Sequence, residues 1–168
     1  MRIGTGAKPG GGSVDELTIR PFVEADEAEV TTWFADAGQL RFFAGPRLTW
    51  PLDAGQWRSI RLDSSVTAWT GVFGQDPTPI GHGELVAESP TTARLARLAI
   101  APRERGHGVG RAMMIKLIDE ARVGGHTLLT LNVHQDNSTA IRTYRGFGFQ
   151  PTGSALAHSN VRLELPLD

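Results

Sequence analysis

Three glycines lie between two arginines in the segment RGHGVGR, residues 105–111. The next residues have the spacing of an amphipathic helix, so this segment would form the N-terminus of that helix. Backbone N–H groups lack partners there and carry a partial positive charge. Glycines let the backbone approach an anion closely, and Arg105 and Arg111 add full charges. The segment therefore indicates a pyrophosphate-binding loop, although a tight structural turn with solvated arginines is the alternative.

Two common phosphate-binding motifs do not fit the sequence. A dinucleotide-binding turn needs G-x-G-x-x-G, but counting from Gly106 or from Gly108 places Arg111 or Met113 at the third glycine. The N-terminal GTGAKPGGGS also fails as a P-loop, because its lysine is followed by proline rather than by serine or threonine.

What does match is R-x-x-G-x-G over residues 105–110, and here the sequence resembles the acyl-coenzyme A binding motif of the GCN5-related N-acetyltransferases, the GNAT superfamily. The preceding LARLAIAP, residues 95–102, resembles the strand with which that family holds the acyl thioester. The later NSTAIRTYRGFGF, residues 137–149, resembles its second signature. The resemblance is specific over residues 94–149 and follows the element order from about residue 17 to residue 165.

The resemblance implies how the donor, acetyl-CoA, would be held. Leu98 and Ile100 would present backbone N–H groups to the pantetheine and the thioester where the sheet parts. Asn137 would hydrogen-bond the pantetheine arm. The phosphates would be bound by Arg105, Gly106, His107, Gly108, Val109, Gly110 and Arg111.

Tyr144 is the candidate general acid. Asn137, Ala140, Ile141 and Tyr144 are spaced i, i+3, i+4 and i+7, so they share one face of a short helix with a polar group at each end. A tyrosine with a pKa of about 10 can protonate a departing thiolate if the site holds the two together. The alternative is a core tyrosine with a wet hydroxyl.

The general base is less clearly indicated. The family often has a carboxylate near the position of Ala96 or Arg97, and here an arginine stands instead. Glu84, two residues after His82 on the same strand face, is the best substitute carboxylate. The alternatives are a polar outer strand face and a cross-strand ion pair between Glu84 and Arg97.

Other polar residues are not assigned to chemistry. His126 and His134, which flank a buried strand, are expected to be structural or solvent-facing. No residue spacing is typical of a metal site, so no metal is expected.

The fold is expected to be α+β, with a mixed, mostly antiparallel central sheet, flanking helices and a parallel strand-helix-strand unit that binds acyl-CoA. Gly74 to Pro77 is a turn signal that would make a hairpin. The expected strands are residues 17–20, 66–73, 80–87, 93–101, 127–133 and 161–165, and the expected helices are residues 24–37, 53–62, 108–122 and 138–144, with a loop over most of residues 38–65 and a turn at 146–149.

Length and composition bound the remaining possibilities. The 168 residues suit one domain, with a flexible glycine-rich tail over residues 1–14 and a single GNAT-like acetyltransferase domain over residues 15–168. A net charge of −1 gives no argument for a nucleic-acid or membrane partner. The absence of cysteine excludes disulfides and a cysteine nucleophile. With neither a signal sequence nor a long apolar run, a soluble cytoplasmic protein is expected.

The leading hypothesis is an N-acetyltransferase that moves acetyl from acetyl-CoA to a primary amine, on a small molecule or a protein, by direct attack in a ternary complex. Residues 38–62 and the hairpin would form the acceptor side, where Phe42, Phe43, Trp50, Trp57 and Trp69 gather. The alternatives are a non-catalytic acyl-CoA sensing module and a protein that uses the sheet only for self-association. The resemblance also allows a homodimer.

Overall fold

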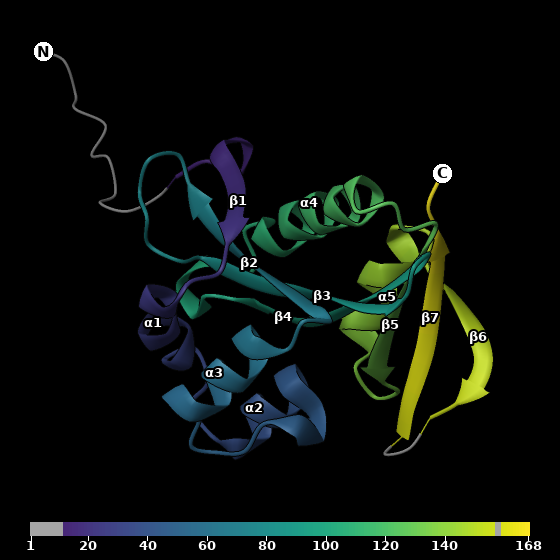
Figure 1. The fold of residues 1–168 in the computed structure, drawn as a ribbon, viewed down its shortest axis with the longest axis horizontal. Helices are drawn as coiled ribbons and strands as arrows, with labels where there is room; N and C mark the ends of the chain where they lie inside the picture. Colours follow the sequence, from purple (N-terminus) through teal and green to yellow (C-terminus); the bar gives the residue numbers. More distant parts are fainter. Residues whose placement is uncertain (1–11, 157–158) are drawn as a thin grey trace, which may run out of the picture.

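A seven-stranded sheet forms the centre of the molecule, with its strands in the order β1-β2-β3-β4-β5-β7-β6 (Figure 1). The structure is a computed structural model that describes residues 12–156 and 159–168. Neighbouring strands are antiparallel except for β4 and β5, which are parallel. This confirms the predicted α+β fold. The strands are β1 (Leu17–Pro21), β2 (Val66–Phe73), β3 (Gly81–Ser89), β4 (Thr92–Ile100), β5 (Leu128–His134), β6 (Gln150–Ala155) and β7 (Asn160–Pro166).

Helices cover both faces of the sheet (Figure 1). Helix α4 (Val109–Val123), which connects β4 to β5, and α5 (Ser138–Gly146) pack on one face. Helices α1 (Glu27–Thr31), α2 (Ala37–Ala44) and α3 (Ala54–Leu62) pack on the other. Short 3-10 turns are η1 (Val14–Glu16), η2 (Glu24–Asp26), η3 (Gly45–Arg47) and η4 (Pro102–Glu104). In the described part of the chain, no helix is long and apolar enough to cross a membrane.

The sheet separates two hydrophobic cores, one under α4 and one under α1, α2 and α3. Helix α4 packs directly on the backbone of the sheet at three strand residues that have no side chain, Gly71, Gly81 and Gly83. A Cβ at Gly71 would lie 2.4 Å from the sulfur of Met113, and a Cβ at Gly83 would lie 2.5 Å from Leu117 Cδ1. These glycines therefore fix the position of α4, whose N-terminus follows the candidate phosphate loop.

A β-bulge in β4 prepares the candidate site. Where β4 pairs with β3, two residues of β4, Arg97 and Leu98, are opposite one residue of β3, Gly83, and Arg97 has a φ of 46° in this bulge. Strand β4 pairs with β5 only as far as Leu95 and Leu131 among the described residues. Because a bulge bends its strand, its position directly after the last paired residue accounts for the separation of β4 from β5.

Most predicted elements agree with the structure to within two residues at each end, but the segment between the first strand and the hairpin does not. The helix predicted over residues 24–37 is wrong in its second half. The hydroxyls of Thr31 and Thr32 donate to the backbone carbonyls of Glu27 and Glu29 in place of continued helix, and α1 ends there.

The loop predicted from residue 38 is also wrong, because α2 occupies residues 37–44. Asp36 caps it by accepting a hydrogen bond from the N–H of Gln39, as Asp53 caps the correctly predicted α3 through Gln56. Strand β6 was missed as well, since residues after 149 were expected only to turn into the sheet.

The flexible tail was predicted over residues 1–14, and residues 1–11 of it lie outside the described residues. At its end, Ser13 is the N-cap of η1 and forms a capping box with Glu16.

Candidate functional site

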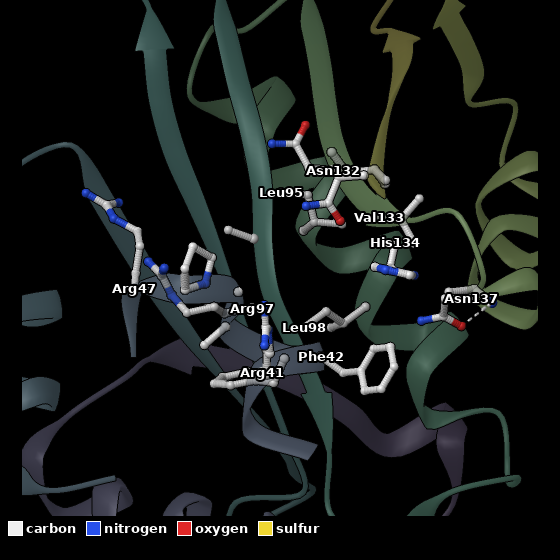
Figure 2. Close-up of a pocket in the computed structure, with 18 of the residues that line it drawn as sticks. Arg41, Phe42, Arg47, Leu95, Arg97, Leu98, Asn132, Val133, His134 and Asn137 are labelled. Atoms are coloured by element: carbon white, nitrogen blue, oxygen red, sulfur yellow. Dashed lines mark hydrogen bonds between the residues drawn. The ribbon is translucent and has the colours of Figure 1, made fainter. Parts of the chain in front are cut away.

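A cleft of about 730 Å³ opens where β4 and β5 separate; we call it the central cleft. It is lined by residues 94–98 of β4, by the end of β5, by α2 and η3, and by the start of α5. Since α2 and α5 pack on opposite faces of the sheet, the central cleft is walled from both faces. Figure 2 shows Arg41, Arg47 and Arg97 on its β4 and α2 side, with Asn132, His134 and Asn137 on the opposite side.

The edge of β4 that faces the separation carries a backbone group of one predicted thioester-binding residue, Ile100. The N–H of Ala101 donates to the carbonyl of Ile80 on β3 at 2.9 Å. Because N–H groups alternate in direction along a strand, that of Ile100 points away from β3, toward the gap left by β5. Leu98 lies with Arg97 in the bulge, where this alternation is interrupted. The side chain of Leu98 lines the central cleft, whereas Ile100 is not among its lining residues.

The loop before α4 has the conformation that an anion-binding turn needs. Gly106 and Gly108 adopt φ angles of 78° and 84°, in the left-handed region that favours glycine. Gly108 is the N-cap of α4, and no side chain of the described residues caps this end. The first N–H groups of α4 are therefore not covered by a capping side chain.

The two predicted arginines of the loop have different surroundings. Arg105 Nε donates to the carbonyl of Ile100 at 3.0 Å, and its Nη2 donates to the carbonyl of Trp33 at 3.3 Å. Arg105 thus ties the loop to the end of β4 and to the segment after α1. Arg111 is exposed and lies over the ring of Phe147, with its Cζ 4.9 Å from the ring centroid.

The remaining loop residues differ in exposure. His107 is exposed, whereas the side chain of Val109 is buried in the core. Gly110 lies in the first turn of α4, where a Cβ would meet Ile100 Cγ1 at 3.6 Å. None of residues 105–111 lines the central cleft.

Helix α5 brings Asn137 and Tyr144 to the central cleft, as their spacing predicts. Asn137 is the N-cap, and its Oδ1 accepts a hydrogen bond from the N–H of Ala140 at 3.2 Å. Tyr144 is half-buried, with its ring edge-on to Phe149 at 6.0 Å between centroids. Burial raises the pKa of the Tyr144 hydroxyl above its ordinary value of 10.0, so the group carries its proton at neutral pH.

Glu84 lies behind the central cleft rather than in it. It is fully buried, and the ion pair with Arg97 that the sequence left open as an alternative is present: Arg97 Nε donates to Glu84 Oε2 at 2.7 Å and Nη2 donates to the same oxygen. The other oxygen lies 3.0 Å from Nε2 of His82. Burial acts to raise the pKa of Glu84, but the hydrogen bonds from His82 and Arg97 outweigh it and hold the pKa below its ordinary value.

The predicted acceptor side is divided between cleft and core. Phe42 and Phe43 line the central cleft, whereas Trp57 is buried in the core under α3. Trp50 is partly exposed outside the cleft, and Trp69 packs against the core under α4. His134 also lines the cleft and His126 does not.

Sequence reasoning missed the arginines on this side. Arg41 and Arg47 line the central cleft from α2 and η3, and Asn132 lines it from β5. The capping pair Asp36 and Gln39 was the signal that could have revealed α2, and with it the position of Arg41.

Comparison with known proteins agrees with this geometry. The profile of the Acetyltransferase (GNAT) family matches residues 27–149, more than half of the chain. The chain therefore belongs to the GNAT acetyltransferase family.

Individual relatives are more distant. Mycothiol acetyltransferase of Mycobacterium ulcerans is 30% identical over 84% of this chain and 43% of its own length. L-2,4-diaminobutyric acid acetyltransferase of Nocardia farcinica is 37% identical over 37% of this chain and 32% of its own. The chain thus spans less than half of the length of these curated relatives.

Among solved structures, spermidine N-acetyltransferase from Vibrio cholerae in complex with CoA and spermine has a TM-score of 0.76 and 17% identity, over 91% of this chain and 96% of the other. At this identity the likeness supports the fold alone.

Proposed function

We propose that residues 15–168 form one domain that transfers the acetyl group of acetyl-CoA to a primary amine held in the central cleft. The observation that carries this proposal is the separation of β4 from β5 between the uncapped N-terminus of α4 and the cleft-facing Tyr144. Donor and acceptor chemistry meet at this opening in the sheet.

Groups on one side of the opening could bind the parts of acetyl-CoA. The N–H groups at the start of α4, with glycines in left-handed conformations before them, would bind the pyrophosphate. The free edge of β4 at Leu98 and Ile100 would pair with the pantetheine arm, and Asn137 would hydrogen-bond it. Bound acetyl-CoA supplies an activated thioester next to Tyr144.

The transfer itself requires two proton movements. The nitrogen of the amine forms a bond to the acetyl carbon while the carbon–sulfur bond breaks, and Tyr144 gives its proton to the departing sulfur. The amine loses its proton to water, because no Asp or Glu is among the described residues that line the central cleft. Tyr144 then recovers a proton from solvent.

Glu84 is assigned a positioning function in this scheme rather than that of the base. Both of its oxygens are engaged by Arg97 and His82, and its lowered pKa makes it a weak proton acceptor. It holds the side chain of Arg97, which does line the central cleft.

A non-catalytic acyl-CoA binding module is the second candidate, favoured only by the absence of a carboxylate from the lining of the cleft. Two measurements decide between the candidates: calorimetry with CoA, and release of free thiol from acetyl-CoA in the presence of a panel of primary amines. We expect saturable CoA binding and amine-dependent thiol release. Binding without release for every amine would favour the module, and absence of binding would contradict both.

A further inference from the structure

Among the described residues, the charged side chains that line the central cleft are all arginines, namely Arg41, Arg47, Arg94 and Arg97. Two of them have carboxylate partners. Arg97 is paired with buried Glu84, and Arg94 Nε donates at 3.0 Å to Glu88, which also accepts from Arg162. The charge of Arg97 is therefore balanced within the protein, and that of Arg94 is balanced in part.

Arg41 and Arg47 are different, because neither guanidinium group forms a hydrogen bond or an ion pair with the described residues. Both are exposed. Arg47 acts on one carboxylate, Asp63, whose pKa is lowered chiefly by hydrogen bonds from Ser65 and to a lesser extent by the charges of Arg47 and Arg97. Asp63 does not line the central cleft. The wall formed by α2 and η3 thus carries two guanidinium groups that are available to an anion.

The position of these arginines separates them from the proposed phosphate site. Arg41 and Arg47 lie on elements of the face opposite α4 and α5. Residues 105–111, at the start of α4, do not line the central cleft. The pyrophosphate of the donor therefore does not account for the charge on the α2 side.

We propose that the acceptor is a small primary amine that also carries a carboxylate, as an amino acid does, and that Arg41 and Arg47 bind this carboxylate. The inference rests on the proposed acetyltransferase function. Guanidinium groups bind carboxylates through paired, charge-assisted hydrogen bonds. A polyamine is disfavoured, since its cations would meet arginines and no carboxylate on the cleft wall.

The same charges favour the reactive form of the amine. Nearby positive charge lowers the pKa of a bound ammonium group, which increases the neutral fraction able to attack the thioester. This effect compensates for the absence of a carboxylate base from the cleft lining. Phe42, with 71% of its surface exposed, also lines the cleft and offers an apolar contact for the rest of the acceptor.

The test compares amines that differ only in the carboxylate. Leucine and methionine are assayed beside their amides and their decarboxylated amines, with spermidine as a polyamine, by thiol release from acetyl-CoA. The amide is the stricter comparison, because its amine is less basic and more of it is neutral. We expect kcat/KM to be about tenfold or more higher for the acid than for its amide.

Variants assign the effect to the two arginines. Arg41→Gln and Arg47→Gln should each raise KM for the acid about tenfold, with less than about threefold change for the amide and with CoA affinity unchanged. Arg58→Gln is the matched control, because Arg58 is an exposed arginine on α3, in the same layer but outside the central cleft. It should behave as the wild type.

A kcat/KM for the amides or for spermidine that equals or exceeds that for the acids would overturn the inference. Unchanged KM values in both arginine variants would overturn it too. Either result would leave the proposed acetyl transfer intact. If no amine releases thiol, calorimetry of the same pairs on CoA-saturated protein is the second readout. Failure of the acids to bind more tightly than their amides would then overturn the inference, whereas failure of CoA itself to bind would overturn the proposed function.

Discussion

At the scale of single residues, the proposed proton transfer to the departing thiolate depends on the hydroxyl of Tyr144. Removing it in Tyr144→Phe keeps the ring and its contact with Phe149, so the fold and CoA affinity should be preserved. Loss of a general acid should lower kcat about 100-fold, with the Kd for CoA within about threefold of the wild type. Steady-state thiol release and calorimetry measure the two quantities.

The pH profile of the wild type gives a second check on Tyr144. Because burial raises its pKa, the acid keeps its proton through neutral pH, and its ionisation should lower activity only in strongly alkaline solution. For the Tyr144→Phe variant, Thr143→Val is the control, because it removes an exposed hydroxyl from the same helix. An unchanged kcat in Tyr144→Phe would exclude Tyr144 as the general acid.

Glu84 should matter for stability more than for proton transfer. Glu84→Gln leaves the buried guanidinium of Arg97 without its counter-charge, which should lower the free energy of unfolding by about 3 kcal/mol. The double variant Glu84→Leu with Arg97→Met removes both charges and should recover most of this loss. Urea unfolding at pH 7 measures both.

The pH dependence of this pair has a definite sign. Since the pKa of folded Glu84 is lowered, its contribution is present above the unfolded value of about 4.3 and is lost as pH falls through the folded pKa. The stability difference between wild type and Glu84→Gln should therefore shrink on acidification. A variant of near-normal stability that has lost turnover about 100-fold would instead identify Glu84 as the base.

At the scale of elements, the loop before α4 can be tested by comparing two glycines with similar φ angles. Gly106 has a φ of 78° and Gly125, just after the same helix, has a φ of 80°, and a Cβ at either position would meet nothing within 4 Å. Gly106→Ala and Gly125→Ala should each lower the free energy of unfolding by about 1 kcal/mol, because alanine is strained at a positive φ. Only Gly106→Ala should also weaken CoA binding, by about tenfold, because it redirects the N–H groups of the loop.

Denaturant unfolding and CoA titration of both variants measure these effects. Equal CoA affinity in Gly106→Ala and Gly125→Ala would contradict a phosphate-binding function for the loop and return it to a structural turn.

Elements with strong local signals could be predicted from the sequence. The apolar stripe of α4 and the turn signal between β2 and β3 gave bounds close to those observed. The segment over residues 24–44 could not be predicted as well, because two threonine side chains end α1 early and a single aspartate starts α2. Such side-chain hydrogen bonds leave little periodic pattern in a sequence.

The site was predictable to the extent that it depends on local motifs. The spacing of Asn137 and Tyr144 placed both on the side of α5 that lines the central cleft. The pairing of Glu84 with Arg97 was visible only as one of several alternatives, since it depends on cross-strand register and on the bulge at Arg97. Arg41 and Arg47 were not identified, because their position depends on how α2 packs against β4.

At the scale of the whole molecule, the separated strands let two ligands approach one opening from the two faces of the sheet. The donor would lie on the side of α4 and α5, and the acceptor on the side of α2. With no cysteine in the chain, acyl-cysteine chemistry is excluded, and direct transfer requires both ligands to be bound together.

The most direct test of this account is the initial rate of thiol release with acetyl-CoA and the amine varied together, combined with mass analysis of the amine product. The account predicts double-reciprocal lines that intersect, as for a ternary complex, and a product that carries one acetyl group on its nitrogen. Parallel lines, which indicate an acyl-enzyme intermediate, or thiol release without an acetylated amine, would contradict it.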